Sequence, residues 1–127
     1  MQKTIEDIKI ELTQPVPSKK NLYKIGRGRF YPDKSVNEFV NASFLEIKHQ
    51  LGKIETIESP VALDICFMMD DRGDLDNKIS MIFDLLQEVK LIGNDRQIRR
   101  VNARREKTKK KNSKTFINIV VLENGKG

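Results

Sequence analysis

The sequence has few of the residues that build disulfides, zinc sites or membrane spans. It contains one cysteine, Cys66, and one histidine, His49. A single cysteine excludes a disulfide framework within the chain, and one cysteine with one histidine cannot supply the ligands of a structural zinc site. The longest apolar run is far below the ~20 residues of a membrane-spanning helix, and no signal-peptide pattern opens the chain. We therefore expect a cytoplasmic protein that makes no use of a membrane.

Basic residues outnumber acidic ones and are concentrated in two stretches. The 127 residues include 24 Lys and Arg against 18 Asp and Glu, which gives a net charge of +6. Ten of the 24 cations lie within residues 96–114, where Glu106 is the opposing acid, and a second basic stretch covers residues 19–34. A basic surplus alone is a weak indication of a polyanionic partner. Two basic stretches around an acidic cluster at residues 70–76 make such a partner the first hypothesis.

The length and the hydrophobic periodicity predict a single small α+β domain over residues 1–127. Alternation of apolar and polar residues indicates strands, and a change to a 3.6-residue period indicates helices. We expect a mixed β-sheet of about four strands with two helices, in the order β-α-β-α-β-β. The predicted strands are residues 8–12, 61–69, 98–105 and 115–122, and the predicted helices are residues 36–51 and 77–89.

The boundaries of the first helix and the pairing of the last two strands are predicted in more detail. Ser35 and Glu38 have the spacing of a capping box at the start of this helix, and Gly52 is placed to end it. The last two strands are expected to pair with each other as a basic hairpin, with residues 107–114 as its loop. The buried face of the first helix is predicted to carry Val36, Val40, Phe44, Ile47 and Leu51.

Two aspartates, Asp74 and Asp76, lie where the second strand ends and the second helix begins. In an extended segment, side chains at i and i+2 point to the same side, roughly 6.5–7 Å apart. Two carboxylates so placed can share one hard cation such as Mg²⁺. Asp95 follows the helix, and a return of the chain could bring it beside the sheet near the other two. The alternative is that Asp76 or Asn77 caps the helix.

Three segments around these aspartates resemble, in order and spacing, the signature of the RusA family of Holliday-junction resolvases. They are Asp74-Leu75-Asp76-Asn77, Phe83-Asp84-Leu85-Leu86 and Asn94-Asp95-Arg96-Gln97-Ile98. The stretch Pro15-Val16-Pro17-Ser18-Lys19-Lys20-Asn21-Leu22-Tyr23 is similar to the family's Pro-Pro-Ser-x-Asn-x-Tyr opening. The resemblance runs over most of the chain and is weakest over residues 34–58.

This resemblance implies a homodimeric, Mg²⁺-dependent endonuclease that nicks two opposing strands of four-way junction DNA in recombination and repair. Mn²⁺ is the alternative metal, and no small-molecule cofactor is implied. The three family carboxylates match Asp74, Asp76 and Asp95, which would hold the metal and carry catalysis. The chain departs from the family at Asn94, where a second Asp is common, and at Ser80, where a Lys is common.

The basic residues are expected to contact DNA phosphates, because their number and clustering suit charge neutralisation. Lys78 would lie about 200° around a regular helix from Asp76 and face away from it. The alternative functions are a non-catalytic basic DNA- or RNA-binding module, whose acids are caps and surface charges, and a ribosome-associated basic protein. The expected DNA contacts are Lys19, Lys20, Arg27, Arg29, Arg72, Asn77, Lys78, Arg99, Arg100, Arg104, Arg105, Lys109, Lys110 and Lys111.

Overall fold

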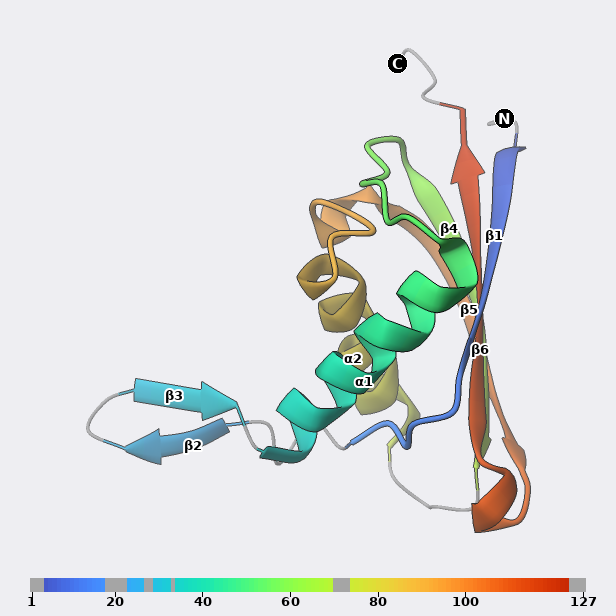
Figure 1. The fold of residues 1–127 in the computed structure, drawn as a ribbon. Coiled ribbons are helices and arrows are strands. Elements are labelled where there is room, and N and C mark those ends of the chain that lie inside the picture. Colours follow the sequence, from blue (N-terminus) through green and yellow to red (C-terminus); the bar gives the residue numbers. More distant parts are fainter. Residues whose placement is uncertain (1–3, 18–22, 27–28, 33, 70–73, 124–127) are drawn as a thin grey trace.

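The chain forms a four-stranded mixed sheet with both helices on one of its faces (Figure 1). The computed structural model describes residues 4–17, 23–26, 29–32, 34–69 and 74–123. The α+β class and the order β-α-β-α-β-β are confirmed, and a separate two-stranded antiparallel sheet, β2 with β3, is added between the first strand and the first helix. The elements are β1 (Thr4–Leu12), β2 (Tyr23–Gly26), β3 (Arg29–Pro32), α1 (Lys34–Leu51), β4 (Val61–Met69), α2 (Leu75–Glu88), the 3₁₀ turn η2 (Asp95–Gln97), β5 (Ile98–Lys107), the 3₁₀ turn η3 (Lys110–Asn112) and β6 (Lys114–Leu122).

The strand order β1-β6-β4-β5 corrects the predicted hairpin. β4 pairs in parallel with β5 and antiparallel with β6, so the last two strands flank β4 and do not pair with each other. The reason lies in their composition. β4 is buried at seven of its positions and half-buried at one more, as suits a central strand that pairs with a neighbour on each side. β5 is mostly charged and exposed, which suits an edge.

Helix α1 begins two residues earlier than the capping prediction requires. Because the helix starts at Lys34, Ser35 lies inside the first turn and is not the N-cap residue, so the capping-box prediction was wrong. Glu38 instead lies 3.8 Å from the Lys34 ammonium, one turn away. The predicted end is confirmed: Gly52 has a φ of 77° and its N–H donates to the Lys48 carbonyl at 2.7 Å.

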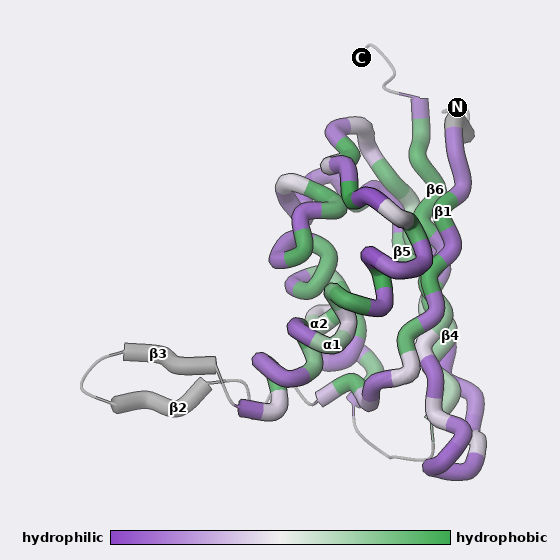
Figure 2. Tube along the Cα trace, in the orientation of Figure 1, coloured by the Kyte–Doolittle hydropathy of each residue, from purple (hydrophilic) through white to green (hydrophobic). Residues whose placement is uncertain are grey.

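The buried face of α1 is rotated slightly from the predicted one. Phe44 is 37% exposed, and Phe39 and Ser43 take its place against the sheet. The buried apolar residues of the sheet and of both helices form one common core. Along the chain, β6 is largely hydrophobic and the loop between β5 and β6 is hydrophilic (Figure 2). No helix in the described part of the chain is long and apolar enough to cross a membrane. The buried residues of α1 are Val36, Phe39, Ser43 and Ile47.

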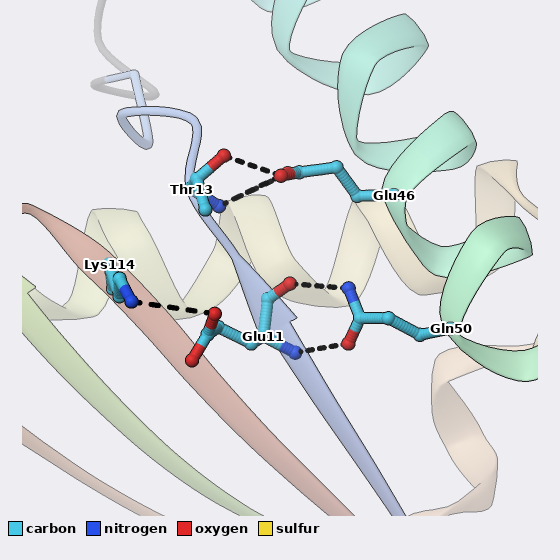
Figure 3. Close-up of polar contacts among 5 residues, drawn as sticks. All are labelled: Glu11, Thr13, Glu46, Gln50 and Lys114. Carbon is cyan, nitrogen blue, oxygen red and sulfur yellow. Dashed lines mark hydrogen bonds and ion pairs between the residues drawn. The ribbon is translucent and has the colours of Figure 1, made fainter.

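Helix α1 also covers the outer edge of β1, whose backbone would otherwise be unpaired there. The Gln50 side chain accepts from the N–H of Glu11 at 2.8 Å and donates to its carbonyl at 2.7 Å, as a neighbouring strand would (Figure 3). Glu46 accepts from the N–H of Thr13 at 3.1 Å and from its hydroxyl. On the other side of β1, Lys114 lies 3.5 Å from the Glu11 carboxylate. These contacts fix the point where the chain leaves β1.

Helix α2 ends in a Schellman motif that positions the turn after it. The N–H of Leu91 donates to the Leu86 carbonyl at 3.0 Å, and that of Lys90 donates to the Gln87 carbonyl at 3.1 Å. Lys90 is the left-handed residue of the motif, with a φ of 68°. Leu86 and Leu91 are both buried. The chain that follows α2 therefore stays packed against the core up to Ile92, directly before Gly93.

Candidate functional site

Asp74 and Asp76 lie together at the start of α2, on a helix terminus and not on an extended segment. Asp74 occupies the N-cap position with φ −64° and ψ 130°, and Asp76 is in the first turn. The Asp74 carboxylate makes no capping hydrogen bond; it accepts from the Asn77 side-chain amide at 3.2 Å. The interpretation that Asp76 or Asn77 is the cap was therefore wrong. Both aspartates are exposed, and the positive end of the helix dipole favours their charge.

The loop between β5 and β6 reaches the same end of the molecule (Figure 1). The N–H of Thr108 donates to the carbonyl of Met69, the last residue of β4, at 3.3 Å. We call this end of the sheet, with Asp74, Asp76 and residues 107–114, the Asp74 end. Three exposed lysines that were expected to contact DNA lie on this loop: Lys109, Lys110 and Lys111.

Lys78 is buried at the Asp74 end and turns away from the surface. Its side chain is 2% exposed, and its ammonium donates to the Val16 carbonyl at 3.0 Å. Lys78 is two residues after the exposed Asp76, which is about 200° around a regular helix, and it faces the core as this angle predicted. An ammonium in this position cannot reach a phosphate, so the expected DNA contact of Lys78 is not available in this structure. Lys78 instead ties α2 to the segment that leads from β1 toward the first basic stretch.

Asp95 belongs to the segment that leads into β5, and β5 begins at the opposite end of the sheet. This segment is the turn η2, directly before β5, and the first residue of β5 pairs with Val61, the first residue of β4. Asp74, in contrast, follows the last residue of β4. We call the end with Asp95 and η2 the Asp95 end. The two ends lie at opposite ends of β4, which has nine residues.

This separation decides what one chain can bind. Magnesium–oxygen distances are about 2.1 Å, so two carboxylate oxygens on one ion lie within about 4 Å of each other. The expected return of Asp95 to Asp74 and Asp76 does not occur within the chain. In the described ranges, no three metal-ligating side chains gather in one place. Of the three candidate aspartates, one chain thus places two at one end of the sheet and one at the other.

The turn that carries Asp95 is well ordered by polar contacts. Asn94 caps η2, and its side-chain oxygen accepts from the N–H of Arg96 at 2.8 Å. An aspartate at position 94 would offer the same acceptor, so this departure from the family pattern preserves the cap. Gln97 makes further contacts that the sequence did not indicate, because the motif alone assigned it no role. Asp95 itself is exposed beside a groove of about 200 Å³ that Phe83 and Arg99 help to line.

The arginines of β5 divide between the two faces of the sheet, because side chains alternate along a strand. Arg99 lies at a register irregularity at the start of β5. Arg105 pairs with the buried Phe67 on the face of the helices, and Arg100 and Arg104 pair with Ala62 and Cys66 on the other face. Arg104 lies 3.8 Å from Asp64 and 3.7 Å from Glu106 on that uncovered face. The four arginines therefore do not form one continuous patch. Four more of the expected DNA contacts lie outside the described residues: Lys19, Lys20, Arg27 and Arg72. For Arg29 the structure describes only the backbone, which belongs to β3.

The uncovered face also contains Cys66, which is buried within β4. Its thiol donates to the Glu106 carboxylate at 3.0 Å. Burial raises the pKa of the Cys66 thiol, and the hydrogen bond to Glu106 adds to the effect. A thiol that is harder to ionise than usual is a poor nucleophile. Cys66 is therefore a structural residue.

The comparisons with known proteins agree with the motifs. The model of the family Endodeoxyribonuclease RusA matches residues 13–120, which include both ends of the sheet and all three aspartates. No curated protein matches the chain. Because the match extends over most of the chain, the protein belongs to the RusA family of endodeoxyribonucleases.

Proposed function

We propose that this protein resolves Holliday junctions by paired nicks in opposing strands of four-way DNA, in recombination and repair. Membership of a nuclease family makes it an endodeoxyribonuclease. The observation that carries the proposal is the pair of exposed carboxylates, Asp74 and Asp76, at the end of the sheet that the lysine-bearing loop also reaches. Cations there would hold the DNA backbone, while a bound metal would offset the repulsion between phosphate and carboxylates.

The chemistry of the donor set fits Mg²⁺, with Mn²⁺ as the alternative. Asp74, Asp76 and Asp95 present exposed carboxylates, the hard oxygen ligands that these ions prefer. When bound, the metal would polarise the scissile phosphate and lower the pKa of a coordinated water. The chain's own contribution is orientation: Asn77 holds the Asp74 carboxylate, and the exposed lysines of residues 107–114 neutralise the approaching strand.

The protein would act as a homodimer whose sites are shared between the two chains. Asp95 lies at the other end of the sheet from Asp74 and Asp76 of its own chain, so the Asp95 end of a second copy would complete the ligand set. A two-fold dimer would have two such composite sites. Two sites related by a two-fold axis suit a junction of near two-fold symmetry that needs two coordinated nicks.

A cleavage assay with a labelled four-way junction tests this function. With Mg²⁺ or Mn²⁺ we expect paired nicks in opposing arms, and with a chelator no cleavage. A linear duplex of the same sequence is the control and should stay intact. Binding of the junction without cleavage at any metal concentration would contradict the proposal and favour a non-catalytic DNA- or RNA-binding module.

A further inference from the structure

Gln97 joins the 3₁₀ turn η2 to the segment that leads into β4. Its side-chain oxygen accepts from the N–H of Gly93 at 2.8 Å and from that of Asn94 at 3.0 Å. Its side-chain nitrogen donates to the carbonyl of Ile57 at 2.6 Å and to that of Ser59 at 3.0 Å. One half-buried amide therefore makes four hydrogen bonds to the backbone of two segments about 40 residues apart in sequence.

The same two segments are also joined through their backbones. Ile57 forms an isolated parallel bridge with Ile92, and its N–H donates to the Leu91 carbonyl at 2.7 Å. Leu91 and Ile92 are fully buried, so this contact anchors the chain to the core just before η2. Gln97 provides the second anchor, just after Asp95. The backbone is thus held on both sides of Asp95.

We propose that Gln97 is a positioning residue for Asp95. The inference rests on the proposed function, in which Asp95 is a metal ligand. Asp95 is exposed, so the position of its carboxylate depends on the backbone that carries it. A backbone that is already fixed loses little conformational entropy when the carboxylate binds a metal. Glutamine suits this place because the site needs two acceptor and two donor interactions, which neither a carboxylate nor an apolar side chain provides.

Two substitutions separate the acceptor role of the Gln97 side-chain amide from its donor role. Gln97→Glu retains acceptors for the N–H groups of Gly93 and Asn94 but cannot donate to Ile57 and Ser59. Gln97→Met keeps the length of the side chain and loses both the acceptor and the donor interactions. The matched control is Gln87→Met on α2, where the half-buried Gln87 amide donates to the Phe83 carbonyl at 3.2 Å. The control removes a side-chain hydrogen bond of the same kind from a helix that does not carry Asp95.

The first readout is the Mg²⁺ concentration for half-maximal junction cleavage. We expect Gln97→Met to raise it about tenfold, with the rate at saturating Mg²⁺ restored to within about threefold, because a loosened ligand weakens binding more than chemistry. Gln97→Glu should lie between this variant and the wild type, and Gln87→Met should match the wild type. A uniform loss of rate at an unchanged Mg²⁺ requirement would overturn the proposal.

The second readout does not depend on cleavage. Mg²⁺ titration of the DNA-free protein by calorimetry should show weaker binding for Gln97→Met, and amide hydrogen exchange at residues 93–97 should be faster in the metal-free state. Equal Mg²⁺ affinity in both proteins would overturn the positioning role. If the wild type binds Mg²⁺ but cleaves no junction, the proposed function fails while this test of Gln97 still stands.

Discussion

The Asp74 end and the Asp95 end hold their carboxylates by different means. At the Asp74 end, one aspartate is the N-cap and the other lies in the first turn of the same helix, and Asn77 contacts the Asp74 carboxylate directly. At the Asp95 end, a single carboxylate lies on a short turn whose backbone is held by Gln97. The first end presents a ligand pair next to exposed lysines, and the second presents one ligand on a fixed turn. Among the described residues, neither end gathers three metal-ligating side chains, and in the proposed dimer each end would meet the other end of a second chain.

The largest expected effect comes from the carboxylates themselves. Asp74→Asn, Asp76→Asn and Asp95→Asn should each lower the single-turnover cleavage rate by about 100-fold or more, since each removes a proposed metal ligand. Junction affinity, measured by mobility shift, should stay equal or increase because a negative charge near the phosphates is lost. The matched control is Asp7→Asn, an exposed carboxylate on β1. A variant that cleaves at close to the wild-type rate would remove its aspartate from the site.

A smaller effect should distinguish the lysines of the Asp74 end from the paired arginine of the uncovered face. Lys110→Gln and Lys111→Gln should each reduce the slope of log K against log salt for duplex arms by about 0.9, because each lysine is exposed and is expected to contact a phosphate. Arg104→Gln should change the slope little, since Arg104 already lies near Asp64 and Glu106. Binding titrations at several salt concentrations measure these slopes. An unchanged slope in the double lysine variant would exclude both lysines from the interface.

The smallest of these effects concerns the lysine that the family has and this chain lacks. Ser80 lies one turn along α2 from Asp76, on the same side of the helix. Ser80→Lys should raise the cleavage rate about three- to tenfold by adding a cation near the developing negative charge, without an equal gain in junction affinity. Lys78→Ala is the comparison: it removes a buried side chain and should lower the melting temperature. An inert Ser80→Lys, together with a Lys78→Ala protein that is stable but inactive, would show that Lys78 is the functional cation.

The parts of the fold that depend on local sequence could be predicted from it. The period-2 pattern of β4, the end of α1 at Gly52 and the order of the elements are properties of short segments, and the structure confirms them. Strand order is different, because β5 and β6 could pair with each other or with β4. The choice depends on which strand buries most apolar surface, and β4 does. The burial of Lys78 could be predicted from the sequence, since a regular helix places it on the side opposite the exposed Asp76.

The candidate site residues stay a prediction from the motif, and their arrangement could not be derived from the sequence. The spacing of Asp74, Asp76 and Asp95 identified the family, yet their separation depends on the length of α2 and on the parallel pairing of β4 with β5. The full role of Gln97 was not visible in the motif, because two of its four hydrogen bonds reach Ile57 and Ser59, far away in sequence. Contacts of this kind require the tertiary structure.

Co-expression of two inactive variants tests the shared site most directly. If a composite site uses the Asp74 end of one chain and the Asp95 end of the other, a mixed dimer of Asp76→Asn with Asp95→Asn contains one intact site. Random pairing should then restore about a quarter of the wild-type nicking. The control is a mixture of Asp74→Asn with Asp76→Asn, in which every composite site lacks a ligand and nicking should remain absent. No restored nicking in the first mixture, or equal nicking in both, would contradict a site shared between two chains.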